Sequence, residues 1–214
     1  MNMYPKCTYL LVILILTATL FISGCISTKS KENQTEKSLV VGEMWLNPGS
    51  GFDPLLDDGV LITEKGLITE TLVGSDKNFK LTPALAVNWT QINDTTWEFV
   101  LRKGVLFHNG KEMTAYDVNE TLNMRVKYSP YIRSLMQFDN GEVINKYVFH
   151  IHTKGNNPIL PNILHYSGTS IFSPDSYDKN YQLIKVIGTG PMKIVNFDSQ
   201  TGTLTVTKNL EWWG

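Results

Sequence analysis

Cysteine is almost absent from this chain, which contains only Cys7 and Cys25. We expect Cys7 to be removed together with the N-terminal segment that contains it, for the reasons given below. A chain that keeps one thiol cannot build an intrachain disulfide framework, a Cys-x-x-Cys redox pair or a cysteine-ligated zinc site. These three classes of protein are therefore excluded.

Clustered positive charge and catalytic motifs are also missing. The chain has 19 basic and 20 acidic residues, and the basic ones do not gather into a patch that would indicate a nucleic-acid surface. Gly188–Pro191 lacks the lysine and the following helix of a phosphate-binding loop. Neither a nucleophile elbow nor a His-Glu-x-x-His pair occurs. The sequence therefore predicts neither an enzyme nor a bound cofactor.

The N-terminus has the three parts of a lipoprotein export signal. Lys6 precedes Leu10–Ile22, an uncharged apolar run that is shorter than the ~20 residues needed to span a bilayer. Ile22–Cys25 then provides small residues followed by cysteine. We predict that residues 1–24 are cleaved and that Cys25 is lipidated, so that the protein is anchored outside the cell membrane. The alternative is a short membrane anchor that is never cut.

The next segment has a composition that cannot form a core. Residues 27–38 are Ser, Thr, Lys, Glu, Asn and Gln without one apolar side chain. Such a composition is typical of a flexible linker. We predict a tether over residues 25–38 and a folded region over residues 39–214.

Apolar periodicity and turn residues predict a mixed α/β folded region. Trp97, Phe99 and Leu101 share one face of a strand, and Thr114 with Asp117 resembles a helix-capping box. The predicted strands are Leu39–Trp45, Trp89–Gln91, Thr96–Arg102, Tyr147–Thr153, Met192–Phe197 and Thr203–Lys208. The predicted helices run from Leu61 to near Gly74, from Thr114 to about Tyr128 and from Pro158 to Tyr166.

Two side-chain pairs could carry metal chemistry. His150 and His152 lie two apart on one predicted strand, so their rings face the same side, but a metal site needs a third ligand nearby. A solvent-facing strand surface is the more ordinary interpretation. Asp57 and Asp58 could be paired acids, calcium ligands or a solvated helix start.

Six blocks in fixed order resemble the family 5 extracellular solute-binding proteins, the receptors of peptide and nickel ABC importers. The first resembles that family's "GL-x-E-x-L" helix. The blocks are Gly66–Val73, Pro83–Ala86 with Trp89, Thr96–Gly110, Thr114–Val118, Ile187–Pro191 and Asn209–Gly214.

The resemblance implies an α/β fold of the class II periplasmic-binding-protein type, in which two lobes close on a ligand. It places the start of the first lobe at residues 39–73, an inserted subdomain at 74–187 and the return to the lobe at 188–214. Family members are longer, and this chain stops before their second lobe begins. The expected fold is therefore truncated, with the first lobe and its subdomain present and the second lobe absent.

The implied function is that of a substrate-binding lipoprotein with ABC permease and ATPase subunits as partners. Nickel-type members hold a metal chelate with aromatics and an arginine of the first lobe. Their aromatic falls near Tyr131 or Ile132, and Arg133 is close but out of register. Their second arginine falls near Thr169–Ser170, where this chain has none. The ligand stays open between peptides and a small nickel chelate. The alternative is a truncated interaction or structural lipoprotein without solute binding.

Four residues are the predicted substrate-binding set, and Cys25 is the predicted lipidation site. Asp57 aligns with a position that faces the cleft in the family's early loop. The other three candidates are Tyr131, Arg133 and His165.

Overall fold

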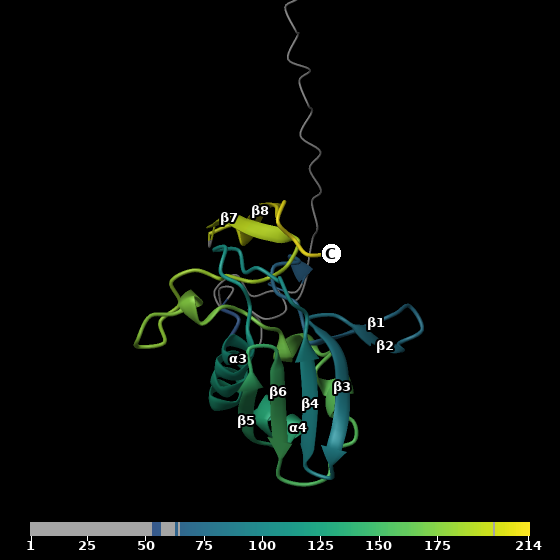
Figure 1. The fold of residues 1–214 in the computed structure, drawn as a ribbon. Coiled ribbons are helices and arrows are strands. Elements are labelled where there is room, and N and C mark those ends of the chain that lie inside the picture. Colours follow the sequence, from purple (N-terminus) through teal and green to yellow (C-terminus); the bar gives the residue numbers. More distant parts are fainter. Residues whose placement is uncertain (1–52, 57–62, 64, 199) are drawn as a thin grey trace, which may run out of the picture. The chain divides into compact units, whose positions relative to one another are not determined.

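A computed structural model describes residues 53–56, 63, 65–198 and 200–214 (Figure 1). The predicted signal peptide, Cys25, the tether, the strand Leu39–Trp45 and Asp57 lie outside the described residues. All described residues belong to one compact unit. The boundaries predicted at residues 73/74 and 187/188 stay predictions. In the described part of the chain, no helix has the length and apolarity that crossing a bilayer requires.

An antiparallel four-stranded sheet with the strand order β3-β4-β6-β5 forms the centre of the fold. Its strands are β3 (Ala86–Asn93), β4 (Thr96–Leu101), β5 (Phe138–Asn145) and β6 (Val148–Thr153). Two helices, α3 (Ala115–Tyr128) and α4 (Pro130–Met136), pack against one face of it, mainly over β5 and β6 (Figure 1). The predicted alternation in β4 is confirmed, because Trp97, Phe99 and Leu101 are buried.

Helix α3 begins and ends where the sequence predicted. The backbone N–H of Thr114 donates to Asp117 Oδ2 at 2.8 Å, and the Thr114 hydroxyl donates to the same oxygen at 2.6 Å. The helix ends before Pro130, and Ser129 then caps α4 by accepting from the N–H of Ile132 at 3.3 Å. The sequence did not predict α4, which follows without a linker.

Shorter elements surround this layered core. They are β1 (Val73–Ser75), β2 (Leu81–Pro83), α5 (Leu160–Ile163), η3 (Ser167–Thr169), η4 (Pro174–Ser176), β7 (Met192–Asp198) and β8 (Thr203–Lys208). The β7–β8 hairpin and the short helix after Pro158 were predicted from the sequence, and both are confirmed.

The helix predicted to reach Leu72 is wrong over its second half. Leu67 has a φ of 57°, a left-handed conformation that ends a helix, and Glu70 pairs with Ile171 in a β-bridge. Ile68 and Leu72 are fully buried and have the spacing of one helix face. In the structure they reach the core from non-helical backbone on either side of the Glu70 bridge, because tertiary pairing outweighs that local pattern.

Candidate functional site

Three of the blocks singled out in the sequence meet at the carboxylate of Glu70. It accepts hydrogen bonds from Thr189 Oγ1 at 2.7 Å, Trp213 Nε1 at 2.9 Å and Trp212 Nε1 at 3.1 Å. The Arg102 guanidinium lies 4.3 Å from the centre of the Trp213 ring. We call these five side chains the Glu70 cluster. It ties the segment around Glu70 to the Gly-Thr-Gly-Pro loop and to the Trp-Trp pair.

Burial dominates the electrostatics of this cluster. Removal from water raises the pKa of the Glu70 carboxyl above its ordinary value of 4.5, and the three hydrogen bonds and Arg102 oppose that rise. The donors are one threonine hydroxyl and two indole N–H groups, and all three are neutral. The cluster joins chain segments and holds two aromatic side chains in place.

The loop Gly188–Pro191 is clamped from both sides. On one side Gly190 N–H donates to Ile68 O at 2.9 Å; on the other, His108 N–H donates to Gly188 O at 2.8 Å. The His108 ring lies against the same loop, with Nε2 2.9 Å from Gly190 O. Burial lowers the pKa of His108.

Three of the predicted substrate-binding residues, Tyr131, Arg133 and His165, lie in the described part of the chain. Tyr131 is 61% exposed on α4, and Arg133 on the same helix donates its Nε to Val126 O at 2.8 Å. His165 follows α5 and places Nε2 3.1 Å from Ser75 Oγ in β1. Within the described ranges, no hydrogen bond or ion pair joins any two of these three side chains. Their binding role stays a prediction.

Arg133 does line an open depression of about 420 Å³. The lining side chains include two further cations, Lys127 and Lys154, and one acid, Asp139. Neither Tyr131 nor His165 belongs to that lining. The depression is therefore a basic surface feature next to α3 and α4 and is separate from the Glu70 cluster.

Sequence reasoning missed a buried arginine on α3. Arg125 is 0% exposed and donates Nε to Gly168 O and an Nη to Pro54 O, both at 2.6 Å. Nearby, the Tyr177 hydroxyl donates to Asp53 Oδ1, and burial together with that carboxylate raises the pKa of Tyr177. Arg125 thus fixes residues 53–56, the described start of the early loop. Arg125 lies on the same face of α3 as the apolar residues Val118 and Leu122, and this spacing could have predicted its burial.

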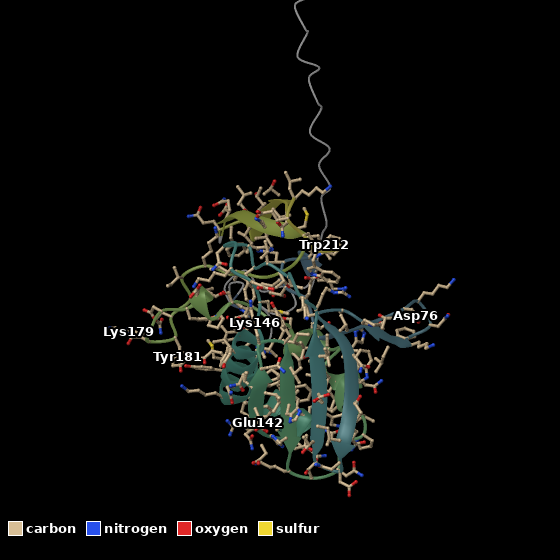
Figure 2. The ribbon with its side chains drawn as sticks, in the orientation of Figure 1. Asp76, Glu142, Lys146, Lys179, Tyr181 and Trp212 are labelled. Atoms are coloured by element: carbon tan, nitrogen blue, oxygen red, sulfur yellow. The ribbon has the colours of Figure 1, made fainter. Side chains whose placement is uncertain are left out.

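The two histidines of β6 face solvent, as the ordinary interpretation predicted, but they are not isolated. Glu98 of β4 and Glu142 of β5 flank them on the same face of the sheet. Glu142 is the third ligand type that sequence reasoning required and could not find. Figure 2 shows Glu142 on the sheet, apart from Trp212 of the Glu70 cluster.

The raised pKa of Glu70 predicts a pH-dependent effect of Glu70→Gln. A carboxyl with a raised pKa in the folded state contributes stability below its ordinary value of 4.5, and this contribution is lost as pH rises through the folded pKa. Glutamine does not titrate. Between about pH 3 and about pH 7, the wild type should therefore lose stability relative to Glu70→Gln. Urea unfolding of both proteins at the two pH values measures this difference.

Glu112→Gln is the control with the opposite sign. Hydrogen bonds from Lys146 and Tyr147 lower the pKa of the exposed Glu112 carboxyl to about 2. A carboxyl with a lowered pKa stabilises the folded state at pH values above its ordinary pKa of 4.5, and this stabilisation is lost as pH falls through the folded pKa. The wild type should therefore gain stability relative to Glu112→Gln as pH rises. If the free energy of unfolding changed equally with pH in the wild type and in Glu70→Gln, this result would contradict the burial of the Glu70 charge.

Comparison with known proteins gives this geometry a context. The sequence profile described as "Bacterial extracellular solute-binding proteins, family 5 Middle" matches residues 80–214. The nickel-binding protein NikA of Staphylococcus aureus is 24% identical over 199 residues, which cover 93% of this chain and 38% of that protein. The chain spans about two fifths or less of the length of the first curated relatives it matches.

Solved structures agree with the profile. A nickel ABC transporter protein from Bacillus halodurans superposes with a TM-score of 0.68 at 31% identity, covering 76% of this chain and 33% of that one. The periplasmic binding protein DppA of Helicobacter pylori, in complex with the peptide STSA, superposes with a TM-score of 0.62 at 26% identity, covering 76% of this chain and 38% of that one. The predicted α/β binding-protein fold is therefore confirmed for the described residues.

Proposed function

Because this chain belongs to the family 5 bacterial extracellular solute-binding proteins, we propose that it contributes to the substrate receptor of an ABC importer. The receptor captures peptides or a small nickel chelate outside the cell and delivers the ligand to a permease driven by an ATPase. The match of the family profile to residues 80–214 carries this proposal. The family is one of binding proteins rather than enzymes, which agrees with the chemistry of the Glu70 cluster.

Both ligand classes are represented among the similar structures. The Bacillus halodurans protein belongs to a nickel transporter, whereas the Helicobacter pylori protein holds a peptide. Thr169 lies where the resemblance places the second arginine of the nickel-type members. It is 0% exposed, and its hydroxyl donates to Tyr166 O at 2.8 Å. A buried hydroxyl cannot supply the charged, multiple-donor contact of an arginine, so this position supports a peptide ligand over a nickel chelate.

The proposal places the protein on the outer face of the cell membrane, attached through a lipid on Cys25. The export-signal pattern of residues 1–25 and the extracellular character of the family support this location. A lipid anchor would keep the receptor close to its permease while the tether lets it move.

Ligand titration of the native polypeptide tests the proposal. An immunoblot of the source-cell membrane fraction, with antibody against residues 65–198, first gives the size of the polypeptide to purify. Titration with short peptides and with nickel–histidine, followed by calorimetry and tryptophan fluorescence, should give saturable binding of one class. Saturable binding of neither class would contradict the proposal and favour an interaction or structural lipoprotein without solute binding.

A matched pair of tyrosine variants tests the predicted site. Tyr131→Ala removes an exposed aromatic of the predicted site and should weaken ligand binding about tenfold, the effect typical of losing one aromatic anchor. Tyr116→Ala is the control, because Tyr116 on α3 is similarly exposed, at 67% against 61%. Equal affinities of the two variants would remove Tyr131 from the site.

A further inference from the structure

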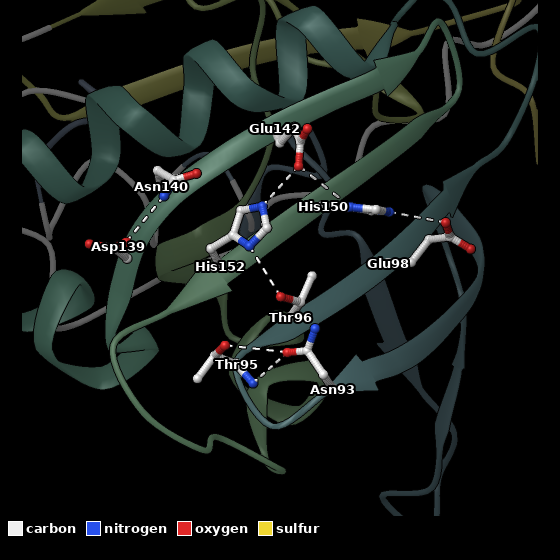
Figure 3. Close-up of polar contacts among 9 residues, drawn as sticks. All are labelled: Asn93, Thr95, Thr96, Glu98, Asp139, Asn140, Glu142, His150 and His152. Atoms are coloured by element: carbon white, nitrogen blue, oxygen red, sulfur yellow. Dashed lines mark hydrogen bonds and ion pairs between the residues drawn. The ribbon is translucent and has the colours of Figure 1, made fainter.

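We propose that Glu142, His150 and His152 form a binding site for one divalent transition-metal ion on the outer face of the four-stranded sheet (Figure 3). The site binds the ion directly through protein side chains. It is therefore distinct from capture of a soluble chelate and does not depend on the proposed transport function.

Strand register brings the three side chains together. His150 of β6 lies directly opposite Glu98 of β4 on one side and opposite Glu142 of β5 on the other. His152 follows two residues later, so its ring stands on the same face. Figure 3 shows both rings directed toward the Glu142 carboxylate. The core is on the opposite face of the sheet, so an ion can reach this one from solvent.

The distances suit a single ion after small side-chain movements. Glu142 Oε2 lies 3.0 Å from His152 Nε2 and 3.7 Å from His150 Nδ1. The three ligand atoms all lie within 4.8 Å of one another. Tetrahedral ligands about 2.0–2.2 Å from one ion lie about 3.4 Å apart, so Glu142 would move slightly away from His152 and slightly closer to His150. Glu142 is the most exposed of the three and can move without disturbing the sheet.

The ring nitrogens that would not bind the ion already have partners. His150 Nε2 lies 3.1 Å from Glu98 Oε2, and His152 Nδ1 lies 3.1 Å from Thr96 Oγ1. Metal-binding histidines characteristically give their second ring nitrogen to a carboxylate or another polar group, which fixes the tautomer and orients the ring. Glu98 and Thr96 fit that supporting role.

The charges of the cluster also favour a cation. Glu98 and Glu142 both face the ring of His150, from opposite sides. Two carboxylates beside the imidazoles place negative charge close to the ligand nitrogens, and this charge attracts a cation. Two imidazoles and one carboxylate suit Zn²⁺, Ni²⁺ or Cu²⁺ better than the hard ions Mg²⁺ and Ca²⁺, which prefer oxygen ligands.

Calorimetric titration with Zn²⁺ tests the proposal. The native polypeptide is purified from the membrane fraction in detergent without a histidine tag, and any free thiol is alkylated so that cysteine does not bind zinc. We expect one ion per chain and loss of that binding in His150→Gln, His152→Gln and Glu142→Gln. Asp139→Asn is the control for charge on the same strand; its carboxylate accepts from Asn140, and zinc binding should be unchanged.

The supporting residues give a graded result. Glu98→Gln should weaken zinc binding about 10–100-fold without abolishing it, as is typical when a partner of a metal-binding histidine is removed. X-ray absorption of the zinc-loaded wild type should show two imidazoles and oxygen around the ion, a result that needs no variant to fold. Absence of saturable binding, or full binding in both histidine variants, would overturn the site. A failure of solute binding does not affect this test.

Discussion

Arg125→Ala is expected to lower the free energy of unfolding by about 3–5 kcal/mol. The guanidinium is wholly buried and donates at 2.6 Å to the carbonyls of both Gly168 and Pro54. Alanine removes both charge-assisted bonds, leaves these carbonyls without that donor and opens a space in the core. Alanine has the highest helix propensity, so α3 itself should not be weakened. Urea unfolding followed by circular dichroism measures the change.

Arg133→Ala is the matched control on the next helix. Arg133 is exposed and makes one hydrogen bond, from Nε to Val126 O. Its loss should cost about 1 kcal/mol or less. Arg125→Lys keeps the charge but not the planar fork that reaches two carbonyls, so it should still be clearly destabilised. A stability of Arg125→Ala close to that of Arg133→Ala would show that Arg125 does not anchor residues 53–56.

Local periodicity was sufficient to predict several elements of the fold. The alternation at Trp97, Phe99 and Leu101 identified β4, and the Thr114–Asp117 cap identified the start of α3. These patterns depend on neighbours within one strand or one helical turn. The sequence alone therefore contained the information that fixed them.

Elements whose conformation depends on pairing with another segment were not predicted. Strand β5 carries a glycine and exposed polar residues, and its pairing with the next strand, β6, makes it a strand. The segment from Ile68 to Leu72 has helical spacing, yet Glu70 in its middle forms a β-bridge with Ile171, far along the chain. In both cases a contact outside the segment decides the conformation.

The candidate sites also depend on contacts between separate segments, which local sequence patterns do not reveal. Sequence spacing placed His150 and His152 on one face, but Glu142 belongs to a strand whose register could not be derived from local pattern. The role of Glu70 likewise depends on Thr189 and two tryptophans far along the chain. Tyr131 and His165 were chosen by resemblance, and their binding role stays a prediction. Chemistry assembled from separate segments is therefore where sequence reasoning was weakest.

Gly188→Ala is expected to destabilise the protein by about 3 kcal/mol or more. A Cβ at this position would lie 1.9 Å from Ile68 O and 2.6 Å from Ile68 C, both backbone atoms that cannot rotate away. Gly188 O also accepts from His108 N–H, so the loop is held on its other side as well. Relief of the clash would require moving the loop and, with it, Thr189 away from Glu70. Thermal and urea unfolding measure the loss.

Gly155→Ala separates this clash from the general effect of replacing glycine. The nearest atom to a Cβ there is Gln137 Oε1 at 3.3 Å, the mobile end of a side chain. Alanine should therefore change stability there by less than about 1 kcal/mol, and the reduced freedom of the unfolded chain could even stabilise the protein. If both substitutions gave equally small effects, the close approach of the Gly188–Pro191 loop to Ile68 would be wrong, and with it the positioning of Thr189 in the Glu70 cluster.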